Sequence, residues 1–93
     1  MFQTIAIHHV RPEHRDDFLS FMHRVEAAVA GAEGLLDFGS YVDAASGRLV
    51  GVGRWVSQEA FTAALPQIMS LSGERRDEWT DADDVLLTLV AAA

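Results

Sequence analysis

The segment that decides the fold runs from Asp43 to Phe61 and reads Asp43-Ala-Ala-Ser-Gly-Arg-Leu-Val-Gly-Val-Gly-Arg-Trp-Val-Ser-Gln-Glu-Ala-Phe61. Its Ser46-Gly47 pair suits a hairpin turn, because glycine accepts the positive φ that such turns require. The residues from Leu49 to Val56 follow as a strand with a single charge, and Ser57 is placed to cap the start of a helix. The segment therefore predicts a turn, a strand and a helix in succession.

Alternation along this strand divides its side chains between two faces. The faces carry Leu49, Gly51, Gly53 and Trp55 on one side, and Val50, Val52, Arg54 and Val56 on the other. Glycine inside a strand leaves bare backbone and often marks the close approach of a ligand. Gly51 and Gly53 beside the large ring of Trp55 therefore predict a hollow on their face.

Length and composition predict one small domain, residues 1–93, that associates with a further copy. A chain of this length buries only about 60–65% of its unfolded surface. Yet 49% of its residues are hydrophobic, which is more apolar side chain than one small core needs. The excess favours a homodimer.

The charge balance argues against two classes of partner. Fourteen acidic residues against seven basic ones give a net charge of −7, and no basic stripe is present, so binding to nucleic acid or to a membrane surface is not expected. The sequence has no cysteine, no evident signal peptide and no apolar run near the roughly 20 residues that span a bilayer. We expect a cytoplasmic protein.

The other elements follow from periodicity and from turn residues. Pro12 to Ala30 has an apolar stripe at helical spacing and Gly31 as its C-terminal stop, whereas Pro66 is expected to end or kink the second helix. Gly73 to Asp84 is predicted as a loop or irregular helix. The predicted order is β-α-β-β-α-β, an α+β fold of the ferredoxin-like type with an antiparallel sheet. Its strands are predicted at Phe2 to Val10, Leu35 to Val42, Leu49 to Val56 and Val85 to Val90.

One face of this sheet has no predicted cover within the chain. The two helices cover the face that carries Trp55, and the opposite face of an antiparallel sheet in water normally carries polar residues. Here that face carries Ile5, Ile7, Val50 and Val52. A second copy of the same sheet is the simplest cover, which predicts a homodimer through this face.

These residues resemble those of the antibiotic biosynthesis monooxygenase family, within the dimeric α/β-barrel superfamily. The resemblance covers about residues 2 to 70, and it rests on Arg11-Pro12, Glu33-Gly34-Leu35-Leu36, Gly47-Arg48-Leu49-Val50 and Arg54-Trp55-Val56-Ser57-Gln58-Glu59-Ala60-Phe61. It implies that two protomers pair their sheets as a barrel. It also implies a pocket in each protomer between the sheet and the helices.

Known members of the family oxidise polycyclic phenols or anthrones to quinones without a metal or flavin, or degrade haem. This sequence matches the tryptophan of both branches with Trp55. It has Gly51 where the quinone-forming branch has asparagine, and Phe61 is the only match to that branch's tyrosine. The haem-degrading branch has an asparagine where Ala6 stands and an iron-ligating histidine in the second helix, whereas residues Ser57 to Gly73 include no histidine.

His8 and Trp55 are the candidate catalytic residues. An imidazole that titrates near neutral pH can take a phenolic or benzylic proton from a substrate and create an electron-rich anion that reacts with oxygen. The alternatives are that His8 is a residue of the pocket rim, and that Trp55 is a core side chain rather than a pocket wall. A metal site is not expected, because His8 and His9 point to opposite faces of a regular strand.

Six residues are candidates for substrate binding: Gly51, Gly53, Tyr41, Phe61, Arg75 and Trp79. Arg75 and Arg76 are adjacent cations that either hold a phenolate or carboxylate or are neutralised by nearby acidic residues. Trp79 is either a lid over the pocket or the anchor of a small apolar cluster. Tyr41 is the only tyrosine, and its hydroxyl is available to a pocket if its strand has the right register.

Together these residues favour a small homodimeric, cofactor-independent monooxygenase that acts on an aromatic or polyketide-like molecule and forms a quinone. The alternative is a non-catalytic dimeric barrel that binds a small hydrophobic ligand, and haem degradation is a weaker alternative. The missing asparagine and tyrosine favour the binding protein. Trp55, Gly53 and His8 favour the enzyme.

Overall fold

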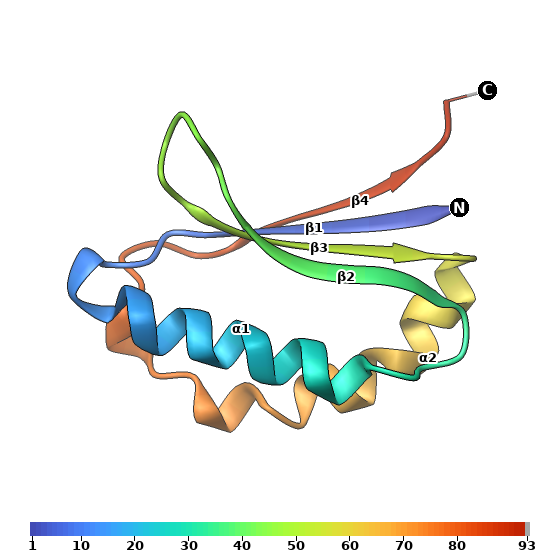
Figure 1. Ribbon diagram of the computed structural model, residues 1–93, viewed down its shortest axis with the longest axis horizontal. Helices are drawn as coiled ribbons and strands as arrows, with labels where there is room; N and C mark the ends of the chain where they lie inside the picture. The colour runs from blue at the N-terminus through green and yellow to red at the C-terminus, as the bar shows by residue number, and fades with distance from the viewer. Residues whose placement is uncertain (93) are drawn as a thin grey trace.

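The computed structural model describes residues 1–92 and has the order of elements predicted from the sequence (Figure 1). Within this range the strands are β1 (Phe2–His8), β2 (Leu35–Val42), β3 (Leu49–Trp55) and β4 (Val85–Val90). The longer helices are α1 (Arg15–Val29), which follows a 3-10 turn at Pro12–His14, and α2 (Gln58–Met69). Two further 3-10 turns, at Ser72–Glu74 and Asp77–Trp79, lie in the connection between α2 and β4.

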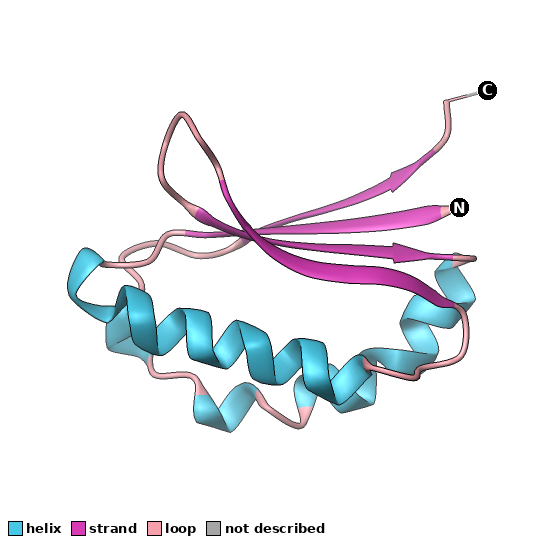
Figure 2. Cartoon of the chain, in the orientation of Figure 1, coloured by secondary structure: helices cyan, strands magenta, loops and turns pink. Residues whose placement is uncertain are grey.

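The sheet is antiparallel throughout, with strand order β2-β3-β1-β4. Both long helices lie on one of its faces, so the chain folds into two layers (Figure 2). The hairpin between β2 and β3 turns at Gly47, whose φ of 76° favours glycine. The ferredoxin-like α+β fold expected from the sequence is confirmed.

α2 begins where the sequence predicts and continues further than expected. The Oγ of Ser57 accepts a hydrogen bond from the backbone N of Ala60 at 3.2 Å, which caps the helix. Of the two expected effects of Pro66, an end or a kink, the first does not occur, because α2 continues to Met69. Pro66 has no N–H to donate to the carbonyl of Thr62, but both residues are exposed, so water can satisfy that carbonyl.

Two strands are shorter than predicted. β1 ends at His8 and β3 at Trp55, rather than at Val10 and Val56. Val10 instead forms an isolated antiparallel bridge with Thr80. This bridge ties the exit of β1 to the segment that leads into β4.

Two aromatic clusters form the core between the sheet and the helices. The first contains Trp55, which is 0% exposed, together with Phe2, Val29 and Ala64. The second contains Phe18, Phe21, Met22, Leu49 and Trp79. The clusters lie toward opposite ends of the sheet, because Phe2 pairs with Trp55 whereas His8 pairs with Leu49.

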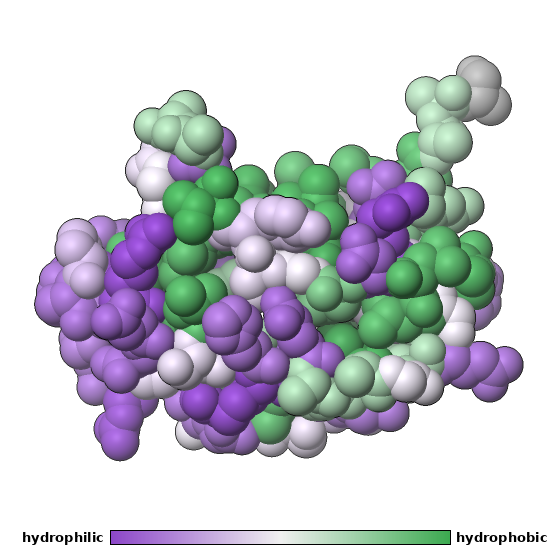
Figure 3. All heavy atoms as spheres, in the orientation of Figure 1, coloured by the Kyte–Doolittle hydropathy of each residue, from purple (hydrophilic) through white to green (hydrophobic). Residues whose placement is uncertain are grey.

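The outer face of the sheet has no helix over it (Figure 1). Directly paired residues of an antiparallel sheet point to the same face, and the register brings apolar side chains together there. They are Ile5, Ile7, Val50, Val52, Val85 and Leu87, with Tyr41 at the margin. Figure 3 shows hydrophobic residues along the strand side of the molecule and hydrophilic residues at the end where β1 connects to α1. In the described part of the chain, no helix has the length and apolar character needed to cross a membrane.

The two glycines of β3 have different surroundings. A Cβ atom on Gly53 would lie 2.6 Å from the Oγ1 of Thr4 and 2.7 Å from the Nε1 of Trp55. A Cβ atom on Gly51 would meet only the Cε of Met22, at 3.8 Å. Gly53, predicted to bind substrate, therefore accommodates the indole of Trp55, and only Gly51 faces open space.

The substitution Gly53→Ala should lower the free energy of unfolding by about 1–3 kcal/mol, because the added methyl group overpacks the Trp55 cluster. Gly51→Ala is the matched control. It should change that free energy by no more than about 1 kcal/mol, and in the stabilising direction. Urea denaturation followed by tryptophan fluorescence measures both values. Equal losses in the two variants would contradict the assignment of Gly53 to packing.

Candidate functional site

A cavity of about 380 Å³ lies between the sheet and the two helices. Its walls are largely apolar and come from both aromatic clusters. The lining residues are Thr4, Ala6, His8, Phe38, Ser40, Gly51 and Leu86 on the sheet, Phe21, Met22, Val25, Phe61, Leu65, Ile68 and Met69 on the helices, and Ser72, Arg75 and Asp84 in the connection between α2 and β4.

Small side chains form the floor of this cavity. Gly51 pairs with Ala6 on β1 and with Ser40 on β2, so glycine, alanine and serine stand side by side across three strands. The cavity exists because this row of the sheet lacks bulk, while the neighbouring rows carry larger side chains. Leu86 of β4 pairs with Ala6 and is exposed, so it borders the cavity at the edge of the sheet.

One end of the cavity carries three ionisable side chains from separate elements. His8 ends β1, Asp84 directly precedes β4, and Arg75 lies between two 3-10 turns. The Nδ1 of His8 lies 3.0 Å from the Oδ1 of Asp84. Arg75 donates two hydrogen bonds to the same carboxylate, one from Nη2 to Oδ1 at 2.9 Å and one from Nη1 to Oδ2. Asp84 therefore bridges the guanidinium and the imidazole.

This arrangement favours the ionised form of Asp84. Burial alone would raise the pKa of Asp84, but hydrogen bonds from His8 and Arg75 lower that pKa well below its usual range. An ionised carboxylate only accepts hydrogen bonds, so the Nδ1 of His8, 3.0 Å from Asp84, is placed to donate, and Nε2 is the ring nitrogen left for a ligand. Phe18 packs against the imidazole, with 4.7 Å between ring centroids, and the guanidinium carbon of Arg75 lies 4.9 Å from the same phenyl ring.

Trp55, predicted as a catalytic residue, lies behind the cavity rather than in its lining. Its indole is fully buried, and its Nε1–H donates a hydrogen bond to the Oγ1 of Thr4 at 3.4 Å. The indole contacts Phe61, with 5.6 Å between ring centroids, and Phe61 does line the cavity. Trp55 therefore has the surroundings of a core side chain that supports the wall.

Tyr41 and Trp79 also lie outside the cavity lining, whereas His8, Gly51, Phe61 and Arg75 belong to it. Tyr41 is 52% exposed and pairs with Val50 on the outer face of the sheet. Trp79 is buried in the Phe18 cluster, and its carbonyl accepts a hydrogen bond from the backbone N of Arg11 at 2.8 Å. The surroundings of Trp79 are those of a cluster anchor.

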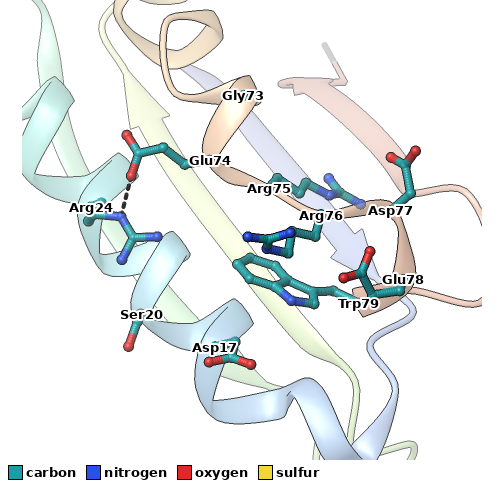
Figure 4. A pocket seen from close by; sticks show the side chains of 10 residues that line it. All are labelled: Asp17, Ser20, Arg24, Gly73, Glu74, Arg75, Arg76, Asp77, Glu78 and Trp79. Carbon is teal, nitrogen blue, oxygen red and sulfur yellow. Dashed lines mark hydrogen bonds and ion pairs between the residues drawn. The ribbon is translucent and has the colours of Figure 1, made fainter.

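A shallow surface depression of about 890 Å³ lies beside the 3-10 turns (Figure 4). Side chains of both charges line it, and Arg24 pairs with Glu74 at 2.7 Å. Both Arg75 and Arg76 line this depression, but Arg76 is exposed, whereas Arg75 is partly buried and also lines the cavity. The interleaved charges give the depression no preference for a ligand of one sign.

The histidines do not gather into a metal centre. His8 lies 3.0 Å from Asp84, whereas His14 lies 3.5 Å from Asp17. Across residues 1–92, no group of three or more His, Cys, Asp or Glu side chains is placed to hold a metal ion.

Sequence reasoning missed Asp84, because the signal for it is the register of β4 against β1. Val85 pairs with Ile7 in the antiparallel register of β4 against β1. The residue before Val85 must therefore lie beside the residue after Ile7, which is His8. An acidic residue directly before the last strand thus indicates a partner for a histidine at the end of the first.

The substitution Asp84→Asn should lower the free energy of unfolding at pH 7 by about 1–3 kcal/mol, since it breaks charge-assisted hydrogen bonds. The pKa of Asp84 is lowered in the folded protein, so its ionised form contributes stability above the unfolded-state pKa of about 3.9. That contribution is lost as the pH falls below this value, because the unfolded chain takes up the proton first. Urea denaturation should therefore give a smaller difference between wild type and variant at pH 3 than at pH 7. The exposed neighbour Asp83 supplies the control, Asp83→Asn, and a difference independent of pH would contradict the bridging role.

Comparison with known proteins shows what this fold is similar to. No family model and no curated protein sequence matches the chain. Rv0793 from Mycobacterium tuberculosis superposes with a TM-score of 0.85 at 18% identity, over 99% of this chain and 95% of that one. A structure named antibiotic biosynthesis monooxygenase gives 0.82 at 18% identity over 100% of both chains. A mutant of MhuD with two manganese protoporphyrin IX molecules bound per active site gives 0.79 at 22% identity, over 100% and 96%. The chain therefore has the fold found in structures named antibiotic biosynthesis monooxygenase, as the resemblance of its sequence predicted.

Proposed function

We propose that this protein is a monooxygenase that binds an aromatic or polyketide-like small molecule in the cavity beside His8 and oxidises it with molecular oxygen to a quinone. The observation that supports this most is the cavity, in which apolar walls meet one oriented imidazole. Apolar pockets with a few convergent polar groups are the usual sites for small molecules. The fold is also similar to that of a structure named antibiotic biosynthesis monooxygenase, which agrees with the proposed function.

The shape of the cavity suits a planar ring system. The row of Ala6, Ser40 and Gly51 gives a floor without bulky side chains. Phe21 of α1 and Phe61 of α2 stand above it on the helix side. A polycyclic substrate lying on the floor contacts aromatic rings from both clusters, and aromatic pairs of this kind add to the free energy of burial.

His8 is the proposed base in this reaction. Its Nε2 takes a proton from the CH₂ group of an anthrone, and Asp84 stabilises the imidazolium that forms. The resulting carbanion reacts with O₂, so that one oxygen atom becomes the new carbonyl and the other leaves as water. The overall change, CH₂ plus O₂ to C=O plus H₂O, balances without an external reductant.

A protein that binds a small hydrophobic ligand without turnover is the second candidate. The positions that carry an asparagine and a tyrosine in the quinone-forming branch carry Gly51 and Phe61 here, and both line the cavity. Fewer polar groups then face the substrate. This observation favours binding without activation of the ligand.

Incubation with an anthrone under ¹⁸O₂ tests the proposal. The enzyme should give the quinone with one labelled oxygen, as measured by product mass. His8→Gln should retain binding but lower the rate by about 10²–10⁴-fold, because it removes the base. Gly51→Leu should abolish binding by filling the cavity while the protein stays folded in thermal melting. Tight binding to the wild type with no product would instead identify the second candidate.

We also propose that the protein is a homodimer through the outer face of the sheet. The apolar side chains there include Ile5, Ile7, Val50 and Val52, which are only partly buried, and no helix of residues 1–92 lies over that face. Stable homodimers commonly bury more than about 2,000 Å² of such surface. A two-fold arrangement of the same face covers it in both copies.

The substitution Val52→Asp should abolish the dimer, because it places a charge in the centre of the proposed interface. Sedimentation velocity should show monomer or aggregate in place of the dimer. Thr62→Asp adds the same charge on an exposed position of α2 and should leave the dimer intact. A wild type that sediments as a folded monomer, or an undisturbed Val52→Asp dimer, would exclude this interface.

A further inference from the structure

The polar end of the cavity presents a balanced charge to a ligand. Arg75 carries a positive charge, and both of its terminal nitrogens donate to the Asp84 carboxylate. The Arg75 side chain is 28% exposed and that of Asp84 26%, so solvent screens the pair only partly. The carboxylate therefore offsets the charge of Arg75 where the cavity ends. The Nε2 of His8 is then the ring nitrogen of the three-residue cluster that is left for a ligand, and the other polar side chains of the lining are the uncharged Thr4, Ser40 and Ser72.

We infer that Asp84 determines the specificity of this site, so that the cavity takes neutral aromatic molecules with a weakly acidic proton and rejects aromatic carboxylates. The favoured class comprises phenols and enolisable cyclic ketones. This inference rests on the proposed function, because it places the ligand in the same cavity beside His8.

A ligand carboxylate meets two unfavourable conditions here. It must leave water for a largely apolar cavity, and an ionised group that enters such a site without a partner is strongly disfavoured. The guanidinium that would serve as its partner is already held by Asp84 in a two-point contact. The ligand must therefore compete with Asp84 for Arg75 and bear the repulsion of a second carboxylate.

A neutral phenol meets neither condition. Its hydroxyl can donate a hydrogen bond to the Nε2 of His8, and its ring replaces water against the apolar walls. When the proton moves to Nε2, the new imidazolium faces Asp84 at the 3.0 Å contact, and the anion forms beside Arg75. The site thus stabilises an anion that forms inside it by proton transfer to His8. It disfavours a ligand that already carries a carboxylate when it enters.

Titration with 1-naphthol and 1-naphthoate at pH 7 tests the inference, because the ring is the same and only the naphthoate is ionised. Phenols titrate near pH 10 and carboxyl groups near pH 4. Wild-type protein, followed by calorimetry, should bind 1-naphthol at least about tenfold more tightly. Asp84→Asn frees the charge of Arg75, so the affinity for 1-naphthoate should rise by about tenfold or more. Asp83→Asn makes the same change in net charge outside the cavity and should leave both affinities unaltered.

Arg75→Gln provides a second variant in case Asp84→Asn does not fold. It removes the cation and keeps the carboxylate, so it should weaken 1-naphthoate further and leave 1-naphthol bound. Equal affinities for the two probes in the wild type would overturn the inference while the proposed function stands. An increase in 1-naphthoate affinity in Asp83→Asn equal to that in Asp84→Asn would also overturn it. Failure of the wild type to bind either probe would overturn the inference together with the proposed site.

Discussion

The interior of this protein depends on the contact between Trp55 and the backbone of Gly53. The indole fits only because position 53 has no side chain, and its N–H finds the hydroxyl of Thr4. This contact holds the Trp55 indole in the aromatic cluster at one end of the sheet. The Phe18 cluster closes the other end. The space above Gly51 remains open between two well-packed regions, so the cavity and the stable core have a common origin.

The polar end of the cavity depends on a different constraint, the path of the chain between α2 and β4. The bridge between Val10 and Thr80 holds this connection against the exit of β1. Arg75 and Asp84 are nine positions apart, yet the 3-10 turn at Asp77–Trp79 between them allows the guanidinium to reach the carboxylate. A segment with little regular structure therefore carries two of the three ionisable groups of the candidate site, and backbone contacts to residues 9–11, directly after β1, hold it in place.

The sequence allowed the fold to be predicted because alternation in β1 and β3 is regular. It placed Leu49, Gly51 and His8 on the inner face, where the structure has them. The sequence did not distinguish the roles of Gly51 and Gly53. Alternation along a strand shows which face of the sheet a residue lies on, but it does not show which side chains contact that residue. The Gly53 contacts come from another strand and from the rotamer of Trp55.

The sequence could not show on which face of the sheet the side chain of Tyr41 lies. The pairing of β2 with β3 shifts between Leu35 and Asp37, and one inserted residue reverses the alternation of every side chain beyond it. Asp84 was missed because its partners are distant in sequence or belong to an irregular segment. Local pattern thus predicted the elements, whereas the site required the register between them.

The two faces of the sheet can change independently, and this limits what the fold alone says about chemistry. Outer residues such as Val50 and Val52 alternate with inner ones such as Gly51, so a substitution on the floor of the cavity leaves the outer surface unaltered. Proteins 18–22% identical to this chain keep the fold over nearly its full length. A fold can be retained while its site is rebuilt. In the proposed function, the chemistry therefore depends on the floor row and on the three ionisable groups at its end, because these set which molecule fits and which charge it can carry.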